Sequence, residues 1–206
     1  MLEECASCPR LAGFLAEVRH QHPGYHARPV LPFGDPRARL LIVGLAPGMH
    51  GANRSGRPFT GDHAGILLYE TLHAFGLASR PVSVARDDGL ELIDCRITNA
   101  VKCLPPQNKP EPAEIRTCNR HLAEEIAASP DVRVILALGQ IAHKAVLLAL
   151  GMKQGACAFG HGARHALTEG RVLIDSYHCS RYNTQTRRLT TADFLDVFRN
   201  IRAELG

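Results

Sequence analysis

Four short apolar runs, separated by longer stretches of helical pattern, constrain the fold of this chain more than any other feature. Each run is rich in Val, Ile and Leu and stops at a turn or a polar cluster. Together they cover residues 39–46, 90–101, 132–138 and 171–177. Nearly continuous apolar strands are typical of a sheet that is buried on both faces. The runs therefore predict a central sheet with little contact with water.

Helical patterns occupy the intervals between these runs, at residues 65–75, 112–128 and 140–150. Pro112 favours a helix start, and Thr191 is the expected N-cap of a further helix at the C-terminal end. Residues 22–35 hold three prolines and two glycines and are expected to form an irregular loop. Strands that alternate with helices favour a three-layer α/β/α sandwich.

Composition sets broad limits on the class of protein. A chain of 206 residues with 45% hydrophobic residues can bury the core of one domain, which we expect to span residues 1–206. It has no apolar run long enough for a membrane helix, and its first residues are acidic, so we expect a cytoplasmic protein of a bacterial or archaeal cell. The net charge of +4 suits an anionic partner but does not identify one.

Seven cysteines without a secretory signal indicate metal ligation rather than a disulfide framework. Cys5 and Cys8 form a CxxC pair, and Cys103 and Cys118 are single cysteines far from it in sequence. Four thiolates can hold either zinc or an iron–sulfur cluster. The other three cysteines are Cys95, Cys157 and Cys179, and they lack such partners. We expect them to pack as small apolar side chains or to face a loop of the functional site.

A glycine-rich loop between residues 44 and 65 follows the first predicted strand and runs into a helix. Its six glycines permit close approach of the backbone to a ligand, and ligands of open α/β sheets bind at this edge. The loop is not a Walker A motif or a dinucleotide fingerprint, because the required glycine spacing and partner residues are missing. An ordinary flexible turn is the alternative.

Two polar side chains end other predicted strands. Asn99 ends the second strand, where its side-chain amide offers both a hydrogen-bond donor and an acceptor. His178 ends the fourth strand. Either residue alone is more often structural than catalytic, but strand ends that converge on one sheet edge favour a shared site.

Residues 44–62 of the loop read GLAPGMHGANRSGRPFTGD. This sequence resembles the first motif of the iron–sulfur uracil-DNA glycosylases, in the form found in the broad-specificity family 5. The resemblance extends from Cys5 to the C-terminal helix. It implies a four-stranded parallel sheet of order 2-1-3-4. It also implies a monomeric, monofunctional glycosylase that flips uracil out of DNA, hydrolyses the N-glycosidic bond and starts base excision repair. Cys5, Cys8, Cys103 and Cys118 would then ligate a 4Fe-4S cluster.

The resemblance also assigns roles within the site. Asp62 would guide water, His178 would stabilise the leaving base, Asn99 would read the base and Phe59 would stack on it. The pocket would be completed by Gly44, Ala46, Pro47 and Gly48. Asp62 fits equally well as the N-cap of the following helix. Because Ala46 replaces a polar group of sister families, we expect tolerance of hypoxanthine, xanthine or ethenocytosine.

Contacts with DNA are expected from residues near the two motifs, although any of them could simply be a solvated surface residue. They are Asn53, Arg54, Arg57, Lys102, Ser180, Arg181, Tyr182 and Asn183.

Two residues of the second motif depart from the family pattern. Cys179 stands where proline is expected, and Arg187 stands where glycine is common. Without proline the loop can be more mobile or differently shaped. Cys179, together with Ala46 in place of the first motif's polar group, motivates an alternative, a catalytically silent iron–sulfur protein that still binds DNA. A small-molecule enzyme is a weaker alternative, because the chain has no cofactor fingerprint.

Overall fold

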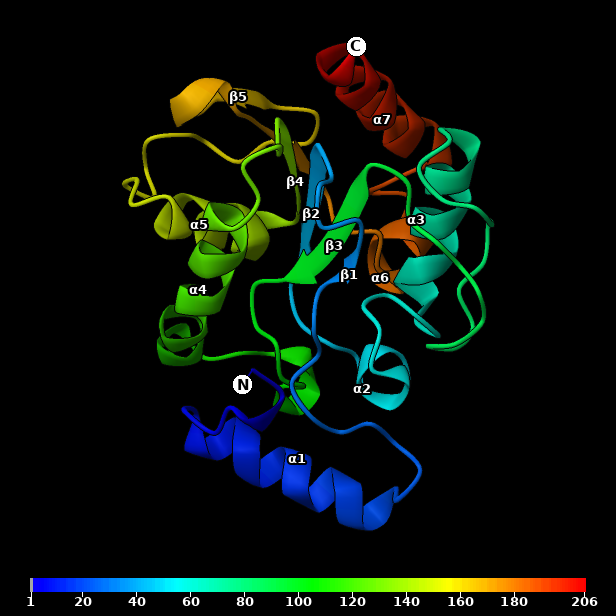
Figure 1. Cartoon of the computed structure of the whole chain (residues 1–206), viewed down its shortest axis with the longest axis vertical. Coiled ribbons are helices and arrows are strands. Elements are labelled where there is room, and N and C mark those ends of the chain that lie inside the picture. The colour runs from blue at the N-terminus through cyan, green and yellow to red at the C-terminus, as the bar shows by residue number, and fades with distance from the viewer. Residues whose placement is uncertain (1) are drawn as a thin grey trace.

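A mixed six-stranded sheet forms the centre of the molecule, seen here in a computed structural model that describes residues 2–206. The strands lie in the order β1-β3-β2-β4-β6-β5 (Figure 1). Their bounds are β1 Phe33–Gly34, β2 Leu40–Gly44, β3 Cys95–Asn99, β4 Val134–Leu138, β5 Arg164–Ala166 and β6 Val172–Ser176.

The four predicted apolar runs correspond to β2, β3, β4 and β6, which pair in parallel as neighbours in the order β3-β2-β4-β6. The expectation that the sheet consists of four parallel strands is wrong, because β1 and β5 add one antiparallel strand at each edge. Both are short and poorly buried, so they lack the apolar pattern that marks the others. The second run is also shorter than predicted, because Asp94 (φ 53°) leaves the extended conformation just before β3.

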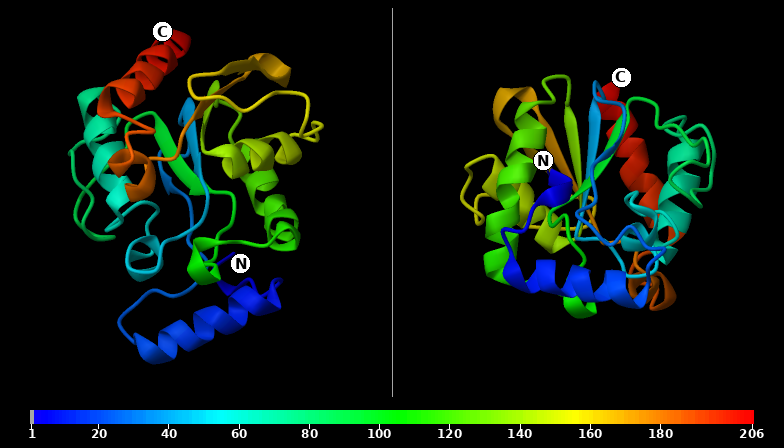
Figure 2. Two further views of the ribbon diagram at one scale, coloured as in Figure 1. Left: turned by 180° about the vertical axis from the view of Figure 1, so that it is seen from behind. Right: turned by 60° about the horizontal axis from the view of Figure 1, so that its bottom comes forward.

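Seven α-helices surround the sheet in the described part of the chain. They are α1 Pro9–Gln21, α2 Ala52–Ser55, α3 His63–Ala74, α4 Pro112–Ala127, α5 Gln140–Ala149, α6 Arg181–Gln185 and α7 Thr191–Leu205. Helices α3 and α7 cover one face, and α4 and α5 cover the other (Figure 2). Alternation along β2 explains this, since Leu40 and Ile42 enter one core and Leu41 and Val43 the other. The predicted α/β architecture is confirmed.

The helix starts follow local capping chemistry. Pro112 begins α4 as predicted, and Glu111 and Glu114 form a capping box there. The expected N-cap of α7 was one residue too late, because Thr190 caps the helix and Asp193 completes its box. Both residues of this box were visible in the sequence, but the adjacent threonines, Thr190 and Thr191, made the start ambiguous.

Helix α1 packs across the end of the sheet where the parallel strands stop (Figure 1). Its buried Leu11, Leu15 and Val18 contact Val101 and Leu104, which follow β3. This third apolar cluster brings the N-terminal cysteines close to the segment after β3. None of the described helices has the length and apolar character needed to cross a bilayer.

Candidate active site

A cavity of about 490 Å³ opens where the parallel strands end. It receives Ala46 after β2, Asn99 from β3, Leu138 from β4 and His178 after β6. This is the edge at which doubly wound sheets bind ligands. The other lining residues are Leu45, Gly48, Phe59, Asp62, His63, Ala64, Asn108, Gly139, Gln140, Ile141, Ser180 and Arg181.

The glycines of the 44–65 loop allow several site residues to lie in close contact. A Cβ on Gly44 would stand 2.4 Å from the amide oxygen of Asn99, and one on Gly65 would stand 1.8 Å from the carbonyl oxygen of Phe59. Both distances are far below van der Waals contact, so glycine is required at each position. Gly44 therefore supports the pocket from behind, and neither it nor the buried Pro47 lines the cavity.

Phe59 has a left-handed backbone (φ 56°), which is strained for an aromatic residue. Its side chain is 5% exposed and faces the cavity, where its ring stacks on His178 with a centroid distance of 5.9 Å and an angle of 24°. Strained backbones of this kind occur at sites that a fold holds in place for function. The ring of Phe59 is therefore positioned as one wall of the cavity.

Asp62 occupies the N-cap position of α3, but its carboxylate does not cap that helix. One carboxylate oxygen instead accepts a hydrogen bond from the backbone N–H of Ala52, at 3.1 Å. The side chain lies against Gly51, where a Cβ would come within 1.9 Å of its Cγ. The alternative prediction, that the Asp62 side chain caps α3, is therefore wrong. The side chain faces the cavity instead.

Burial raises the pKa of Asp62 above its ordinary value of 3.8, although the Ala52 N–H and the nearby Arg54 and His50 oppose the shift. A carboxylate with a raised pKa inside a cavity is suited to accept a proton.

His178 is half-buried, and its Nδ1 atom is sealed from water without a hydrogen-bond partner in the described structure. Burial lowers the pKa of this imidazole to about 4, so the ring is neutral at physiological pH. The Asn183 amide donates a hydrogen bond of 2.8 Å to the carbonyl oxygen of His178. Asn183, expected to contact DNA, thus holds the loop that carries His178.

The two departures from the family pattern have structural explanations. Cys179 is fully buried in the larger apolar core, and burial raises the pKa of its thiol to about 12. It therefore anchors the loop by packing, in place of the rigid ring of proline. Arg187 has a left-handed backbone (φ 57°), which explains why glycine suits this position.

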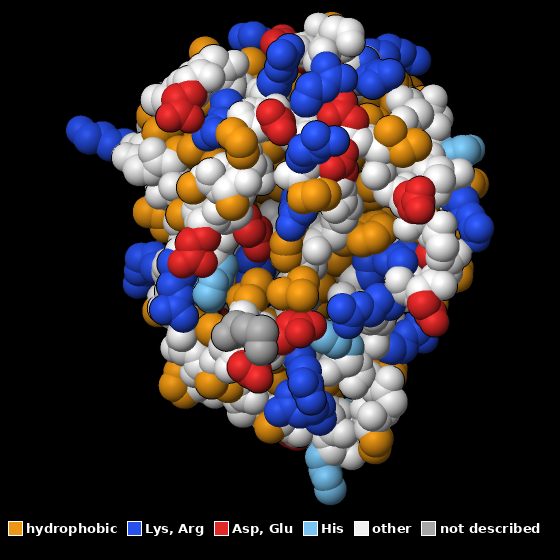
Figure 3. Space-filling model, viewed as in Figure 1, with side chains coloured by type: hydrophobic (Ala, Val, Ile, Leu, Met, Phe, Trp, Pro, Cys, Tyr) orange, Lys and Arg blue, Asp and Glu red, His pale blue; other side chains and the backbone are white. Residues whose placement is uncertain are grey.

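The residues expected to contact DNA divide into exposed and buried groups. Ser180 and Arg181 line the cavity, Arg54 is exposed, and Tyr182 is 70% exposed beside them. Basic side chains are scattered among apolar ones on the face shown in Figure 3. The prediction that Asn53, Arg57 and Lys102 contact DNA directly is wrong, because all three residues are buried.

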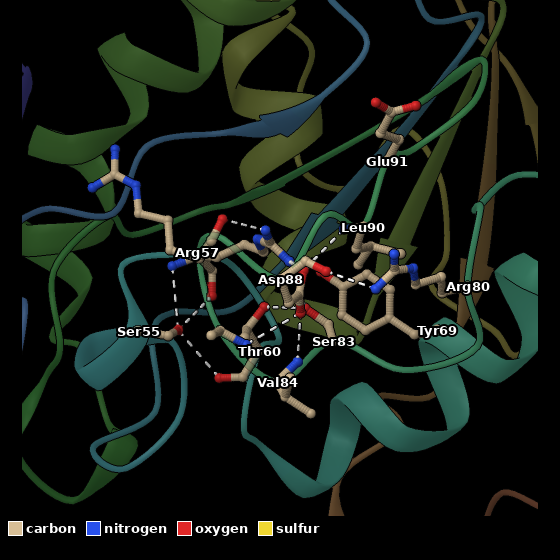
Figure 4. Close-up of polar contacts among 12 residues, drawn as sticks. Ser55, Arg57, Thr60, Tyr69, Arg80, Ser83, Val84, Asp88, Leu90 and Glu91 are labelled. Carbon is tan, nitrogen blue, oxygen red and sulfur yellow. Dashed lines mark hydrogen bonds and ion pairs between the residues drawn. The ribbon is translucent and has the colours of Figure 1, made fainter.

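Arg57 serves the fold instead of the DNA surface (Figure 4). Its guanidinium forms a 2.8 Å ion pair with Asp88 and donates to the Ser83 hydroxyl at 3.0 Å and to the Arg86 carbonyl. It also lies 4.4 Å from the centre of the Phe33 ring. Arg57 therefore fastens the segment before β3 to the glycine-rich loop.

Lys102 is fully buried, and its ammonium donates to Thr98 at 2.6 Å and to Glu125 at 2.7 Å. Replacement of Lys102 by alanine leaves the Glu125 carboxylate without its cation and should cost about 3–5 kcal/mol of unfolding free energy. Denaturant unfolding measures this loss. Arg181→Ala is the matched control and should weaken DNA binding with little loss of stability. A reduced salt dependence of DNA binding in the Lys102 variant would contradict this assignment.

The four predicted thiol ligands meet in one small hollow between the N-terminal segment and α4, lined by Cys5, Cys8, Cys103 and Cys118. Burial and the neighbouring thiolates raise the pKa of Cys103 to about 12. That of Cys5 falls to about 6, because hydrogen bonds from Ser7, His121 and Arg120 outweigh its desolvation. Four thiols that converge on one hollow match the donor set of a thiolate-ligated metal centre.

The spacing of these thiols bears on the kind of metal centre. Among the described residues, three or more ligand atoms lie within 4.8 Å of one another only at His143, His165 and Asp175. Thiolates around a single tetrahedral zinc ion would be about 3.8 Å apart, given Zn–S bonds of about 2.3 Å. The four thiols do not form a group as compact as this among the described residues.

The cluster of His143, His165 and Asp175 is a hydrogen-bonded network. Asp175 contacts His143 at 2.8 Å and His165 at 3.0 Å, and the other nitrogen of His143 lies 3.1 Å from the Cys157 carbonyl oxygen. Ligand atoms around a tetrahedral ion would be about 3.3 Å apart, given metal–ligand bonds of about 2.0–2.1 Å. The shorter contacts indicate bridging protons, and the network holds β6 just before His178.

Sequence reasoning missed several cavity residues, among them His63, Asn108, Gln140 and Ile141. Gln140 stands two residues after the end of β4, as His178 does after β6, so the rule that found His178 applies to it as well. His63 links two elements, because its Nε2 lies 3.2 Å from the Thr184 hydroxyl of α6. Nothing in the sequence marks Asn108.

Comparison with known proteins identifies the family. A model of the uracil DNA glycosylase superfamily matches residues 31–202. The type-5 uracil-DNA glycosylase of Thermus thermophilus is 49% identical, over 100% of this chain and 95% of its own length. That of Pyrobaculum aerophilum is 43% identical, over 100% and 91%. A type-4 uracil-DNA glycosylase of Sulfurisphaera tokodaii is 30% identical, over 80% and 70%. The chain belongs to the uracil-DNA glycosylase superfamily and resembles its type-5 members over its full length.

Proposed function

We propose that this protein is a monofunctional DNA glycosylase that excises uracil from DNA and so starts base excision repair. The observation that carries the proposal is the cavity at the ends of the parallel strands, which brings together Asp62, Asn99, His178 and Phe59. Uracil must leave the base stack to enter a cavity of this kind.

Asn99 and Phe59 bind the extruded base. The amide of Asn99 offers a donor and an acceptor to the N3 and O4 edge of uracil, and the ring of Phe59 provides an apolar surface for stacking. Asn99 is only 3% exposed, so its hydrogen bonds to the base form away from competing water.

His178 and Asp62 act on the reacting bond. As the bond between the sugar carbon and the base nitrogen breaks, negative charge accumulates on the base, and neutral His178 donates a hydrogen bond to it at O2. Asp62 accepts a proton from the attacking water, whose oxygen forms the new bond to the sugar carbon. The products are the free base and an abasic site.

The range of bases extends beyond uracil in this proposal. Ala46 lines the cavity with a methyl group where sister families carry a polar side chain, so no polar group at this position selects for one base. The cavity volume of about 490 Å³ also suits a bicyclic base. Hypoxanthine, xanthine and ethenocytosine are therefore proposed as further substrates.

The four thiols are proposed to hold a 4Fe-4S cluster with a structural role. When bound, the cluster would cross-link the N-terminal segment to the loop before α4, and base excision itself requires no electron transfer. Purified protein should then contain iron and sulfide in equal amounts. Loss of the cluster should lower solubility and thermal stability; stoichiometric zinc in its place would contradict the assignment. Cys118→Ser should lose the metal, whereas the control Cys157→Ser should retain it.

Base release from oligonucleotides that hold one uracil or one hypoxanthine tests the function directly. The native chain should release the base and leave an abasic site. A chain that binds this DNA and never releases a base would instead be a catalytically silent iron–sulfur relative, the alternative that Cys179 and Ala46 first suggested. Release of uracil alone would restrict the proposed substrate range.

A further inference from the structure

Asn108 connects the thiol region to the cavity. Among the described residues that line the cavity, it alone comes from the segment between Cys103 and Cys118. It is exposed, whereas Asn99 is almost fully buried. The cavity thus has one buried amide, Asn99, and two exposed ones, Asn108 and Gln140, of which only Asn108 comes from the segment between the two cysteines.

The backbone holds Asn108 in an unusual conformation. Gln107 and Asn108 both have left-handed backbones, with φ values of 55° and 57°. Hydrogen bonds from Asn108 N–H to the Pro105 carbonyl (3.1 Å) and from Lys109 N–H to the Pro106 carbonyl (3.0 Å) close the turn. Two successive non-glycine residues in this region are strained, and strained turns that persist are held by their surroundings and are often functional.

Arg10 holds this turn from the thiol side. Its guanidinium donates to the Lys109 carbonyl at 3.3 Å and makes two hydrogen bonds to Glu114, at 2.8 and 2.7 Å. Arg10 stands two residues after Cys8, one of the four thiols. Arg10 therefore links the helix that directly follows Cys8 to the residue that follows Asn108.

We propose that Asn108 is a specificity-determining residue that binds bicyclic bases, and that Arg10 is the positioning residue that presents it. This inference rests on the proposed glycosylase function. A pyrimidine held at Asn99 ends within the cavity, whereas the second ring of a purine extends further toward the mouth. The Asn108 amide can donate to a ring nitrogen or carbonyl oxygen and accept from an N–H group, so it suits several deaminated purines.

The test compares hypoxanthine with uracil in Asn108→Ala. Loss of one hydrogen bond should lower the kcat/KM for hypoxanthine release by about 3–10-fold, while uracil release stays nearly unchanged. A binding assay that does not depend on turnover uses oligonucleotides with 2′-fluoro analogues of the two nucleotides, in which fluorine slows bond cleavage. Affinity should fall for the purine analogue only. Gln107→Ala, on the same turn but outside the cavity lining, is the matched control and should leave both substrates unaffected.

A double-mutant cycle tests the positioning role of Arg10. Arg10→Ala should shift the ratio of hypoxanthine to uracil release in the same direction, and adding Asn108→Ala should shift it no further. Additive shifts would overturn the role of Arg10. Equal losses for both bases, or no change in the ratio, would overturn the role of Asn108. A native chain that releases no base at all would instead refute the proposed function.

Discussion

Replacement of Asp62 by asparagine is expected to lower the single-turnover rate of uracil release by about 10²–10⁴-fold. Asparagine keeps the size of the side chain and can still accept the Ala52 N–H bond, but it cannot take a proton from water. Rates measured on uracil-containing duplexes give the result directly. A loss below about threefold would remove Asp62 from the chemical step.

A second substitution perturbs Asp62 without replacing it. A Cβ on Gly51 would stand 1.9 Å from the Asp62 Cγ, so Gly51→Ala should displace the carboxylate and lower the same rate. Gly155→Ala is the matched control, because a Cβ there meets no atom within 4 Å. If both variants retain the native rate, the position of the carboxylate does not matter for the reaction.

The pH profile should carry the signature of Asp62. Because burial raises its pKa, the carboxylate gains its proton at a higher pH than an ordinary aspartate, and the acid decline in rate should begin correspondingly early. The native state binds this proton more tightly than the unfolded state, so this group favours unfolding as pH rises from 3.8 through the raised pKa. At neutral pH, Asp62→Asn should therefore be at least as stable as the native chain.

Replacement of His178 by alanine should lower the rate of uracil release by about 10²–10³-fold, the usual cost of losing one donor to a developing anion. His20→Ala, on the exposed side of α1, is the control and should have no effect. An unchanged rate in His178→Ala, with the fold intact, would assign leaving-group stabilisation to another residue.

The titration of His178 provides a separate check. Its pKa of about 4 predicts a neutral ring throughout the range from pH 5 to pH 8, which NMR of the imidazole measures. Because the unfolded chain binds this proton more readily, the group favours unfolding as pH falls from 6.5 toward 4. His178→Ala should remove this loss of stability on acidification. A measured pKa near 6.5 would contradict the neutral-donor role.

The sequence by itself determined the alternation of strands and helices and the placement of Asn99 and His178 at strand ends. These features follow from local periodicity and from the rule that parallel strands share one functional edge. The glycine-rich loop could also be predicted, because glycine spacing is a local property of the sequence. The edge strands β1 and β5 could not be predicted, since such short segments carry too few residues to form a pattern.

Tertiary structure decided which polar side chains meet water and which enter the cavity. Lys102 has the same charge as an exposed DNA contact, but Glu125, distant in sequence, holds it in the core. Asp62 occupies a helix-cap position, and only the approach of Gly51 and Ala52 turns its carboxylate away from α3. Asn108 lines the cavity, and the carbonyl of the next residue, Lys109, accepts a hydrogen bond from Arg10. Each outcome depends on contacts between side chains and backbone groups that the fold brings together, which local sequence patterns do not encode.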